Sequence, residues 1–274
     1  MNRINFGVVK PTFMIIGVQK GGTSSLFHYL SQHPKLITPR IKELHYFDTY
    51  NETPSKPFLS NFPRRYLEQK ISFEATPRYL YFPETARKLY EFDSNLKFIV
   101  IFRDPVKRAF SAWNMYRQMS KDPNWVDRAK KHEDNNPHDK SYSFFYKRGF
   151  PTFEEWIKIE MDPEFSAHII EPSIIRRGYY KEQIESYLKY FSKNQMYFVD
   201  FNNFKNNTIS VLNDITEFLT ISNFDKINLN LEVKNERKYS EPLDPVLYHD
   251  LLRHFQMKNE GLEETLGFEL EWMH

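Results

Sequence analysis

The stretch FMIIGVQKGGTSSLFHYL, residues 13–30, decides the fold because it joins a strand to a helix through a glycine turn. Phe13–Ile16 is a short apolar run typical of a buried strand, and Ser24–Gln32 carries apolar residues on one helical face. Glycine lets backbone N–H groups approach an anion closely, and the start of a helix adds N–H donors and partial positive charge. The stretch therefore predicts a phosphate-binding loop.

Three of the eight glycines in the chain, Gly17, Gly21 and Gly22, fall in this loop. The ATP-binding version of such a loop reads G-x-x-x-x-G-K-[ST], but here Thr23 takes the lysine position and Lys20 lies inside the loop. A lysine there can reach a group attached to a 5′-phosphate. The alternative is a glycine turn that merely joins strand to helix. The candidate phosphate ligands are Lys20, Gly21, Gly22, Thr23, Ser24 and Ser25.

The rest of the chain alternates predicted strands with predicted helices. The other strands are expected at Ile71–Ala75, Leu96–Phe102 and Met196–Asp200. Helices are expected at Pro83–Tyr90, from the Asp104–Pro105 cap to Met119, and at Phe153–Glu160, Tyr179–Phe191, Ile209–Leu219 and Pro245–Phe255. This order predicts an α/β fold with a central parallel sheet flanked by helices, as one domain over residues 1–274. The polar residues 120–150 are expected to form an irregular lid or substrate loop.

Composition excludes several classes of protein. The chain has no cysteine, so disulfides, thiolate metal sites and cysteine nucleophiles are absent. A net charge of +2 does not indicate a nucleic-acid partner. No apolar run is long enough for an export signal or a membrane span, which predicts a soluble, cytoplasmic protein without a membrane partner. His132 and His138 lack the spacing of further metal ligands, so no metal site is expected.

A second candidate anion site follows the strand at Leu96–Phe102, in the sequence IFRDPVKRAFSAW, residues 101–113. Arg103 ends the strand, at the edge where open α/β sheets bind ligands. Ser111 lies in the next helix, three residues after Arg108 and on the same face. An arginine fork and a hydroxyl suit a second phosphate, remote from the first. The alternative is that Arg103 pairs with a carboxylate and Ser111 is a small helix contact.

Two phosphate sites suggest a nucleotide with phosphates at both ends of its ribose. The motifs that carry these sites also resemble those of a known family. IGVQKGGTSSL and FRDPVKRAFSAW resemble the 5′-phosphosulfate loop and the 3′-phosphate motif of sulfotransferases that use 3′-phosphoadenosine 5′-phosphosulfate (PAPS). KELHYFD, residues 42–48, is similar to the heparan-sulfate-type branch, whose motif is K-E-x-H-F-F-D. The similarity continues through FEATPRYLY (73–81), RGYYKEQIESYLKYF (177–191) and NEGLEETLGFELEW (259–272).

The resemblance implies a P-loop-like fold, the product 3′-phosphoadenosine 5′-phosphate (PAP) and no required metal. It implies that Glu43 is the general base, that His45 orients the base or contacts the acceptor, and that Lys20 stabilises the bridging oxygen and the sulfuryl group. The reaction is then an in-line displacement at sulfur without a covalent enzyme intermediate. By itself, the spacing of Glu43 and His45 also fits an ion-paired surface loop. The further ligand candidates are Arg177 for the donor and Asp48, Arg78 and Tyr179 for the acceptor.

One position departs from the heparan-sulfate-type pattern. That branch often carries a lysine after the glutamate of an E-K-[ST]-P segment, and this chain has Ala75 there. The expected acceptor is therefore a small polar metabolite bearing a hydroxyl or amine, with an oligosaccharide as the alternative. Two other classes of protein predict different residues at these positions. A P-loop kinase or NTPase would carry lysine at position 23, and a non-catalytic nucleotide-binding module would be expected to lack Glu43. The sequence does not indicate an oligomeric state.

Overall fold

The computed structural model describes residues 10–49, 56–63, 71–136, 140–166, 172–224, 227–234, 239 and 241–274. The contacts of the chain form two compact units. The first contains the residues up to Arg103 together with Glu182–Arg237, and the second contains Asp104–Lys181 together with Lys238–His274. The single domain that we predict over residues 1–274 stays a prediction.

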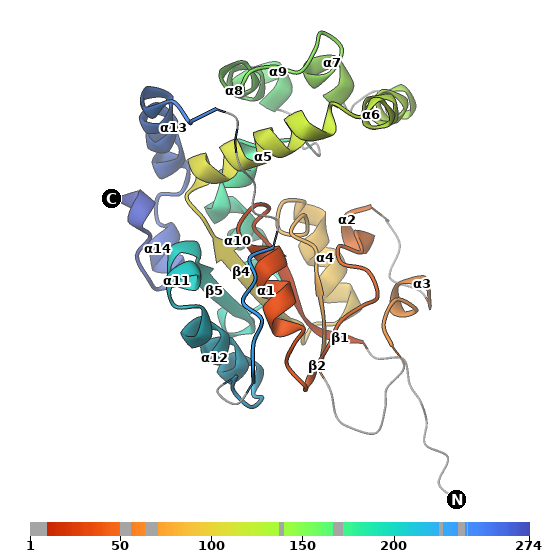
Figure 1. The fold of residues 1–274 in the computed structure, drawn as a ribbon, viewed down its shortest axis with the longest axis vertical. Coiled ribbons are helices and arrows are strands. Elements are labelled where there is room, and N and C mark those ends of the chain that lie inside the picture. Colours follow the sequence, from red (N-terminus) through yellow and green to blue (C-terminus); the bar gives the residue numbers. More distant parts are fainter. Residues whose placement is uncertain are drawn as a thin grey trace, which may run out of the picture. The chain divides into compact units, whose positions relative to one another are not determined.

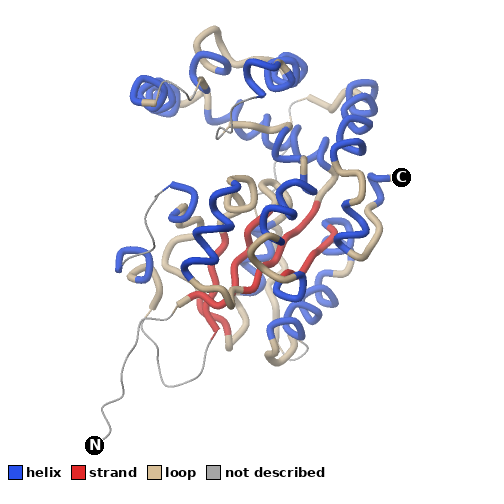
Figure 2. Tube along the Cα trace, turned by 180° about the vertical axis from the view of Figure 1, so that it is seen from behind, coloured by secondary structure: helices blue, strands red, loops and turns tan. Residues whose placement is uncertain are grey.

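The first unit is built around a five-stranded parallel sheet in the order β2-β3-β1-β4-β5. Figure 2 shows these strands in red, side by side. The strands are β1 (Pro11–Gly17), β2 (Leu36–Ile37), β3 (Ile71–Ala75), β4 (Lys97–Phe102) and β5 (Met196–Asp200). The predicted α/β fold with a parallel sheet is therefore confirmed. Because β1 is the central strand, its carboxyl end lies between those of β3 and β4.

Helices cover both faces of this sheet (Figure 1). The helices of the first unit are α1 (Thr23–Leu30), α2 (Tyr46–Thr49), α3 (Lys56–Leu59), α4 (Pro83–Phe92), α11 (Phe201–Asn206) and α12 (Thr208–Leu219), with a 3-10 turn η2 (Lys193–Gln195). Helix α10 (Tyr180–Leu188) begins in the second unit and continues into the first. The predicted boundaries of α1, α4, α10 and α12 agree with the observed ones to within a few residues. Helices α2, α3 and α11 were not predicted.

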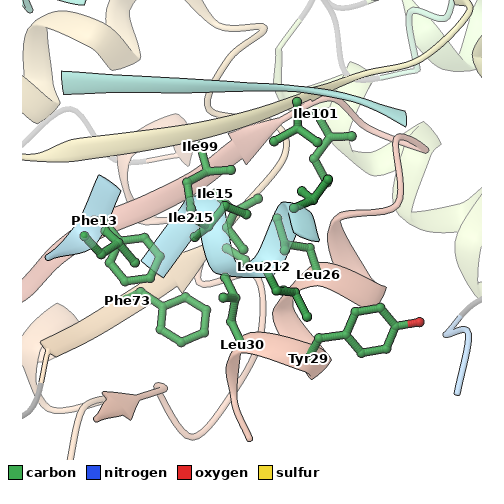
Figure 3. Packing of buried hydrophobic residues seen from close by; sticks show 14 of the residues in the cluster. Phe13, Ile15, Leu26, Tyr29, Leu30, Phe73, Ile99, Ile101, Leu212 and Ile215 are labelled. Atoms are coloured by element: carbon green, nitrogen blue, oxygen red, sulfur yellow. The ribbon is translucent and has the colours of Figure 1, made fainter. Parts of the chain in front are cut away.

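Alternation along the strands determines which residues meet which helix. Phe13 and Ile15 point to the face covered by α1 and α12, where they pack with Leu26 and Leu212, as Figure 3 shows. Phe98 of β4 points to the other face, and its ring lies 5.3 Å from that of Tyr187 on α10. Both faces of the sheet are buried, which is why the strands read as continuous apolar runs.

The second unit is helical within the described residues. Its elements are α5 (Pro105–Met119), α6 (Pro123–Asn135), α7 (Ser141–Phe145), α8 (Phe153–Met161), α9 (Pro163–Ser166), η1 (Arg176–Gly178), α13 (Pro245–Lys258), α14 (Leu262–Leu266) and η3 (Glu271–Met273). Asp104 caps α5 as predicted, since its side chain accepts the N–H groups of Val106 and Lys107. The core of the unit surrounds Trp156, whose ring stacks on Phe145 at 3.9 Å.

The expectation of irregular structure over residues 120–150 is wrong for most of that segment. Pro123–Asn135 forms α6 and Ser141–Phe145 forms α7. The sequence appears irregular because α6 buries no residue fully, so the apolar periodicity that marks most helices is weak. Asp122 caps α6 by accepting the N–H of Asn124, and Pro123 occupies its first turn. The role of this segment as a lid stays a prediction.

We expect Phe73→Ala to destabilise the protein by about 3–5 kcal/mol because it removes a fully buried ring from the core beneath the sheet. The ring of Phe73 stacks on Phe13 at 4.8 Å and lies 5.2 Å from the ring of Phe27. Urea unfolding measures the change. Ile209→Ala, at an exposed position of α12, is the control and should change the free energy of unfolding by less than about 0.5 kcal/mol. Equal effects of the two substitutions would contradict this account of the core.

Candidate active site

The glycine loop between β1 and α1 is a tight turn held against β4. Val18 donates its N–H to the carbonyl of Ile101 over 3.1 Å, and Gly21 donates to the carbonyl of Val18 over 2.9 Å. A Cβ on Gly21 would lie 2.9 Å from both carbonyl oxygens, so the turn accepts no larger residue there without shifting. Lys20 has a φ of 66° and Gly22 a φ of 91°. The chain then enters α1 at Thr23, and the positive end of that helix faces the loop.

Arg103 at the end of β4 contacts the same loop. Its Nη1 donates to the carbonyl of Lys20 over 2.8 Å, and its guanidinium lies 4.9 Å from the ring centroid of Phe201. The structure thus brings two predicted ligand residues together that are 83 positions apart in the sequence. Arg103 lies against the backbone of the first loop because β1 and β4 are adjacent parallel strands whose carboxyl ends meet. Its predicted contact with a second phosphate stays a prediction.

Five charged side chains form a continuous chain of contacts near the end of β3. Lys42 Nζ lies 2.6 Å from Glu43 Oε1, and His45 Nε2 lies 3.4 Å from Glu43 Oε2. On the other side of the imidazole, Nδ1 donates to Asp48 Oδ2 over 2.9 Å. Asp48 also pairs with Arg78, whose Nε lies 3.0 Å away. The structure therefore brings Glu43, His45, Asp48 and Arg78 together in a series of alternating charge. Their contact with an acceptor stays a prediction.

These contacts determine the charge state of the two central groups. Burial raises the pKa of Glu43, but the hydrogen bond with His45 and the positive charge of Lys42 outweigh it and lower that pKa to about 2. Burial lowers the pKa of His45, but Asp48 and Glu43 outweigh it and raise that pKa to about 9. Near neutral pH the cluster therefore holds a carboxylate at Glu43 and an imidazolium at His45.

The loop and the charged cluster lie at one edge of the sheet. Gly17 ends β1, and the turn after β3 is bonded to β1 because Leu80 donates its N–H to the carbonyl of Ile16 over 3.0 Å. Arg78 lies in that turn, and Arg103 follows β4 on the other side of β1. This is the edge at which open α/β sheets bind ligands, beyond the carboxyl ends of their strands.

The remaining predicted ligands lie in the second unit. Ser111 and Arg177 are 2% exposed, and Arg108 is fully buried. Helix α5, which carries Arg108 and Ser111, packs against η1, which carries Arg177. Arg108 donates from Nη2 to the carbonyl of Ile174, while its Nε and Nη1 have no hydrogen-bond partner among the described residues. Burial lowers the pKa of Arg108, and the neighbouring charge of Arg177 lowers it further.

Tyr179 follows Arg177 and Gly178 in the second unit. Its hydroxyl lies 2.8 Å from Nε2 of His254 on α13, and Lys258 lies 5.4 Å from the centroid of its ring. Tyr179 is thus held by α13. Its predicted contact with an acceptor stays a prediction.

Sequence reasoning missed an extended segment, residues 227–234, that lies along α1. Lys234 donates its N–H to Ser25 Oγ over 3.1 Å, and Tyr29 donates its hydroxyl to the carbonyl of Leu231 over 3.1 Å. Asn230 donates its N–H to Gln32 Oε1 over 2.7 Å. Ser25 and Tyr29 lie four residues apart on α1 and so share one face, and Gln32 follows two residues after the end of that helix. The alternation INLNL at 227–231 was the available signal for an extended segment, but its partner lies about two hundred residues earlier.

Within the described ranges, no group of three or more histidine, aspartate or glutamate side chains is arranged to hold a metal ion. His138 lies outside the described residues. No helix in the part of the chain that the structure describes is long and apolar enough to cross a bilayer. The predicted cytoplasmic location stays a prediction.

Comparisons with known proteins identify the family of this chain. Residues 10–241 match the family described as Sulfotransferase domain. The chain is 24% identical to the membrane-associated sulfotransferase kil1 of Dictyostelium discoideum, over 96% of this chain and 67% of that protein. It is 28% identical to heparan sulfate glucosamine 3-O-sulfotransferase 5 of Mus musculus, over 77% of this chain and 54% of that protein. The chain thus spans about half the length of this relative.

A solved structure extends the similarity to three dimensions. The sulfotransferase from Alicyclobacillus acidocaldarius superposes with a TM-score of 0.71 at 25% identity, covering 97% of this chain and all of that one. The match to the sulfotransferase domain covers most of the chain, so the protein belongs to the sulfotransferase family. It is an enzyme of the transferase class, and its relatives include the heparan sulfate glucosamine 3-O-sulfotransferases.

The charged cluster predicts how His45 titrates. Because its pKa is raised in the folded protein, its contribution to stability is fully present below the ordinary value of 6.5 and is lost as the pH rises through about 9. We expect Glu43→Gln to lower the pKa of His45, and Asp48→Asn to lower it further, because Asp48 is the stronger partner. NMR titration of the imidazole measures both shifts. His33, which is bonded to Ser222, is the internal control and should not shift. An unchanged His45 in both variants would contradict the contacts described.

Proposed function

We propose that this protein transfers the sulfuryl group of PAPS to a hydroxyl group of a small polyhydroxylated acceptor. The observation that carries the proposal is the glycine loop, with Arg103 against its backbone, at the same sheet edge as the Lys42–Glu43–His45 cluster. Membership of the sulfotransferase family supports the reaction type. The donor, the base and the acceptor are proposals.

The loop is proposed to hold the 5′ end of the donor. Backbone N–H groups from Gly22 into the start of α1 provide donors for an anion, and Thr23, Ser24 and Ser25 add hydroxyls. Lys20 stabilises the negative charge that builds on the bridging oxygen as the bond to sulfur breaks. A kinase-type loop would instead use lysine at position 23, and the threonine there is the reason that we do not favour nucleoside triphosphate chemistry.

The 3′-phosphate is proposed to use Arg103, Ser111 and Arg177, as the family resemblance implies. Within the second unit, the buried guanidinium of Arg108 carries N–H groups without hydrogen-bond partners among the described residues, beside the positive charge of Arg177. Two buried cations on neighbouring elements are stabilised by an anion. Ser111, on the same face of α5 as Arg108, adds a hydroxyl. This concentration of positive charge supports a phosphate ligand in that unit.

Glu43 is proposed to accept the proton of the acceptor hydroxyl while the hydroxyl oxygen attacks sulfur. The bond from sulfur to the phosphate oxygen breaks as the new bond forms, and PAP leaves. The contacts with Lys42 and His45 keep Glu43 ionised, so it is ready to accept a proton, but they also lower its basicity. The mechanism therefore requires the acceptor to replace one of these contacts. His45, held by Asp48, is charged near neutral pH and acts as a donor to the acceptor, not as the base.

The acceptor is proposed from the charge of the cluster and from the relatives. The charges of Lys42, Glu43, His45, Asp48 and Arg78 nearly balance, and Ala75 is buried in β3, so it adds no cation to this edge. Such a site suits an acceptor with few negative charges. The heparan sulfate relatives support a sugar-like hydroxyl. Asp48, Arg78 and Tyr179 are the proposed acceptor contacts. Labelled-sulfuryl transfer from PAPS to a panel of small sugars, other polar metabolites and glycosaminoglycan oligosaccharides identifies the class.

We expect PAP to bind equally well in the presence of magnesium and of EDTA, because the loop needs no metal to neutralise the phosphate. Lys20→Ala should weaken binding about 10–100-fold, the range for losing a hydrogen bond to a charged group. Isothermal titration calorimetry measures both. Lys35→Ala removes an exposed lysine beyond the other end of α1 and should leave binding unchanged. Magnesium-dependent binding of ATP in preference to PAP would favour the kinase alternative instead.

We expect Glu43→Gln to lower kcat about 10²–10⁴-fold, because it removes the proton acceptor while keeping nearly the same shape. Affinity for PAP should stay within about threefold, since Glu43 is not proposed to touch the donor nucleotide. Single-turnover transfer from labelled PAPS measures the rate. Glu217→Gln, an exposed position on α12, is the matched control with the same change of charge. If Glu43→Gln kept the full rate, Glu43 would not be the base.

A further inference from the structure

Glu74, the second-last residue of β3, is a carboxyl group in an apolar core. Its side chain is fully buried, between Phe73 and Ala75 in the strand. Burying an ionisable group is costly unless hydrogen bonds compensate for the lost water. One oxygen, Oε1, accepts the N–H of Leu44 over 3.2 Å and the hydroxyl of Thr76. The other, Oε2, has no hydrogen-bond partner among the described residues.

Leu44 lies between the two residues that define the charged cluster. Glu43 has a φ of 64° and His45 a φ of 51°, so both are in the left-handed region, which side chains other than glycine rarely occupy. Each such residue is strained and persists only where its surroundings hold it. With Glu43 and His45 both in this conformation, their side chains meet, and His45 Nε2 lies 3.4 Å from Glu43 Oε2.

A second hydrogen bond holds the same segment two residues later. Tyr46 donates its N–H to the hydroxyl of Tyr79 over 3.1 Å. Tyr79 is fully buried, and its carbonyl accepts the hydroxyl of Tyr187 over 2.8 Å. The N–H groups of two alternate residues, Leu44 and Tyr46, are thus bonded to side chains on β3 and on the turn after it. Neither acceptor lies in the segment that it holds.

We propose that Glu74 is a positioning residue: by accepting the N–H of Leu44, it keeps Glu43 and His45 in the backbone conformation that brings their side chains together. Tyr79 supports it through Tyr46. The significance for catalysis rests on the proposed function, in which Glu43 is the base. The hydrogen bond itself does not depend on that function, so the two can be tested separately.

The charges around Glu74 determine which substitution is informative. Burial raises its pKa to about 7, and the charge of Asp48 raises it while that of His45 lowers it. The phenol groups of Tyr79 and Tyr187 also face it, and each has a pKa raised by burial and by the charges of Glu74 and Asp48. Glu74→Gln removes the charge but keeps an oxygen that can accept the N–H of Leu44. Glu74→Ala removes both, so comparing the two variants isolates the hydrogen bond.

We expect Glu74→Gln to keep kcat within about threefold of the unsubstituted enzyme. Glu74→Ala should lower kcat about 10²-fold, the size of effect that a small misplacement of a catalytic group produces. KM for PAPS should be unchanged in both variants. By NMR titration, the pKa of His45 should fall toward 6.5 in Glu74→Ala and shift little in Glu74→Gln, because only the first loses the contact between His45 and Glu43. The control for correct folding is His33, whose pKa should be unchanged in both Glu74 variants.

Several outcomes would overturn the proposal. It fails if Glu74→Ala and Glu74→Gln give the same kcat and the same pKa of His45, since the N–H acceptor would then be irrelevant. Should Glu74→Ala not fold, Tyr79→Phe removes the hydroxyl that holds Tyr46 and should lower kcat without changing KM for PAPS; full activity there would also count against the proposal. If the unsubstituted protein transfers nothing from PAPS, the proposed function fails, while the titration of His45 still tests the hydrogen bond.

Discussion

The adjacency of three parallel strands, β3, β1 and β4, is the constraint on which the candidate site depends. Because their carboxyl ends lie at one edge, a glycine loop, an arginine and a charged cluster from distant parts of the sequence become neighbours. Close packing makes this arrangement exacting. Gly21 lies so near the carbonyl oxygens of Val18 and Ile101 that the loop follows β4 rather than standing away from it. The loop geometry is thus a consequence of sheet packing as much as of glycine flexibility.

Charge at this edge is arranged in alternation. Each anion of the series from Lys42 to Arg78 lies between two cations, and this keeps Glu43 and His45 charged despite their partial burial. The same pairing that keeps Glu43 ionised also weakens it as a base, so the catalytic role that we propose for Glu43 requires the acceptor to replace one of its partners. Ala75 stands where the heparan-sulfate-type pattern often has a lysine. The cation that the β3 end of the series contains is therefore Arg78, which pairs with Asp48.

Support for the site comes from hydrogen bonds between side chains and backbone N–H groups. Segment 227–234 runs along α1, and the N–H of Lys234 is bonded to Ser25. A proposed phosphate ligand is thus held by a segment about two hundred residues later in the sequence. Glu74 and Tyr79 hold the Glu43–His45 turn through its backbone. In the second unit, the carboxylate of Glu160 accepts the N–H groups of Ile174 and Ile175 and so holds the backbone just before Arg177. Each of these is a backbone N–H bonded to a side chain of another segment of the chain.

The sequence by itself determined the local structure and the chemistry. Apolar runs, caps and glycines identified the principal strands and helices, because these signals need only near neighbours. The motifs that contain Lys20, Glu43 and Arg103 implied a sulfotransferase through their resemblance to that family. Tertiary structure alone decided that Arg103 lies on the first loop, that Glu74 bonds to Leu44, and that Lys234 bonds to Ser25. These three contacts join residues tens to hundreds of positions apart. No single-sequence pattern encodes such a pairing, because it arises only when the strands have assembled in their order.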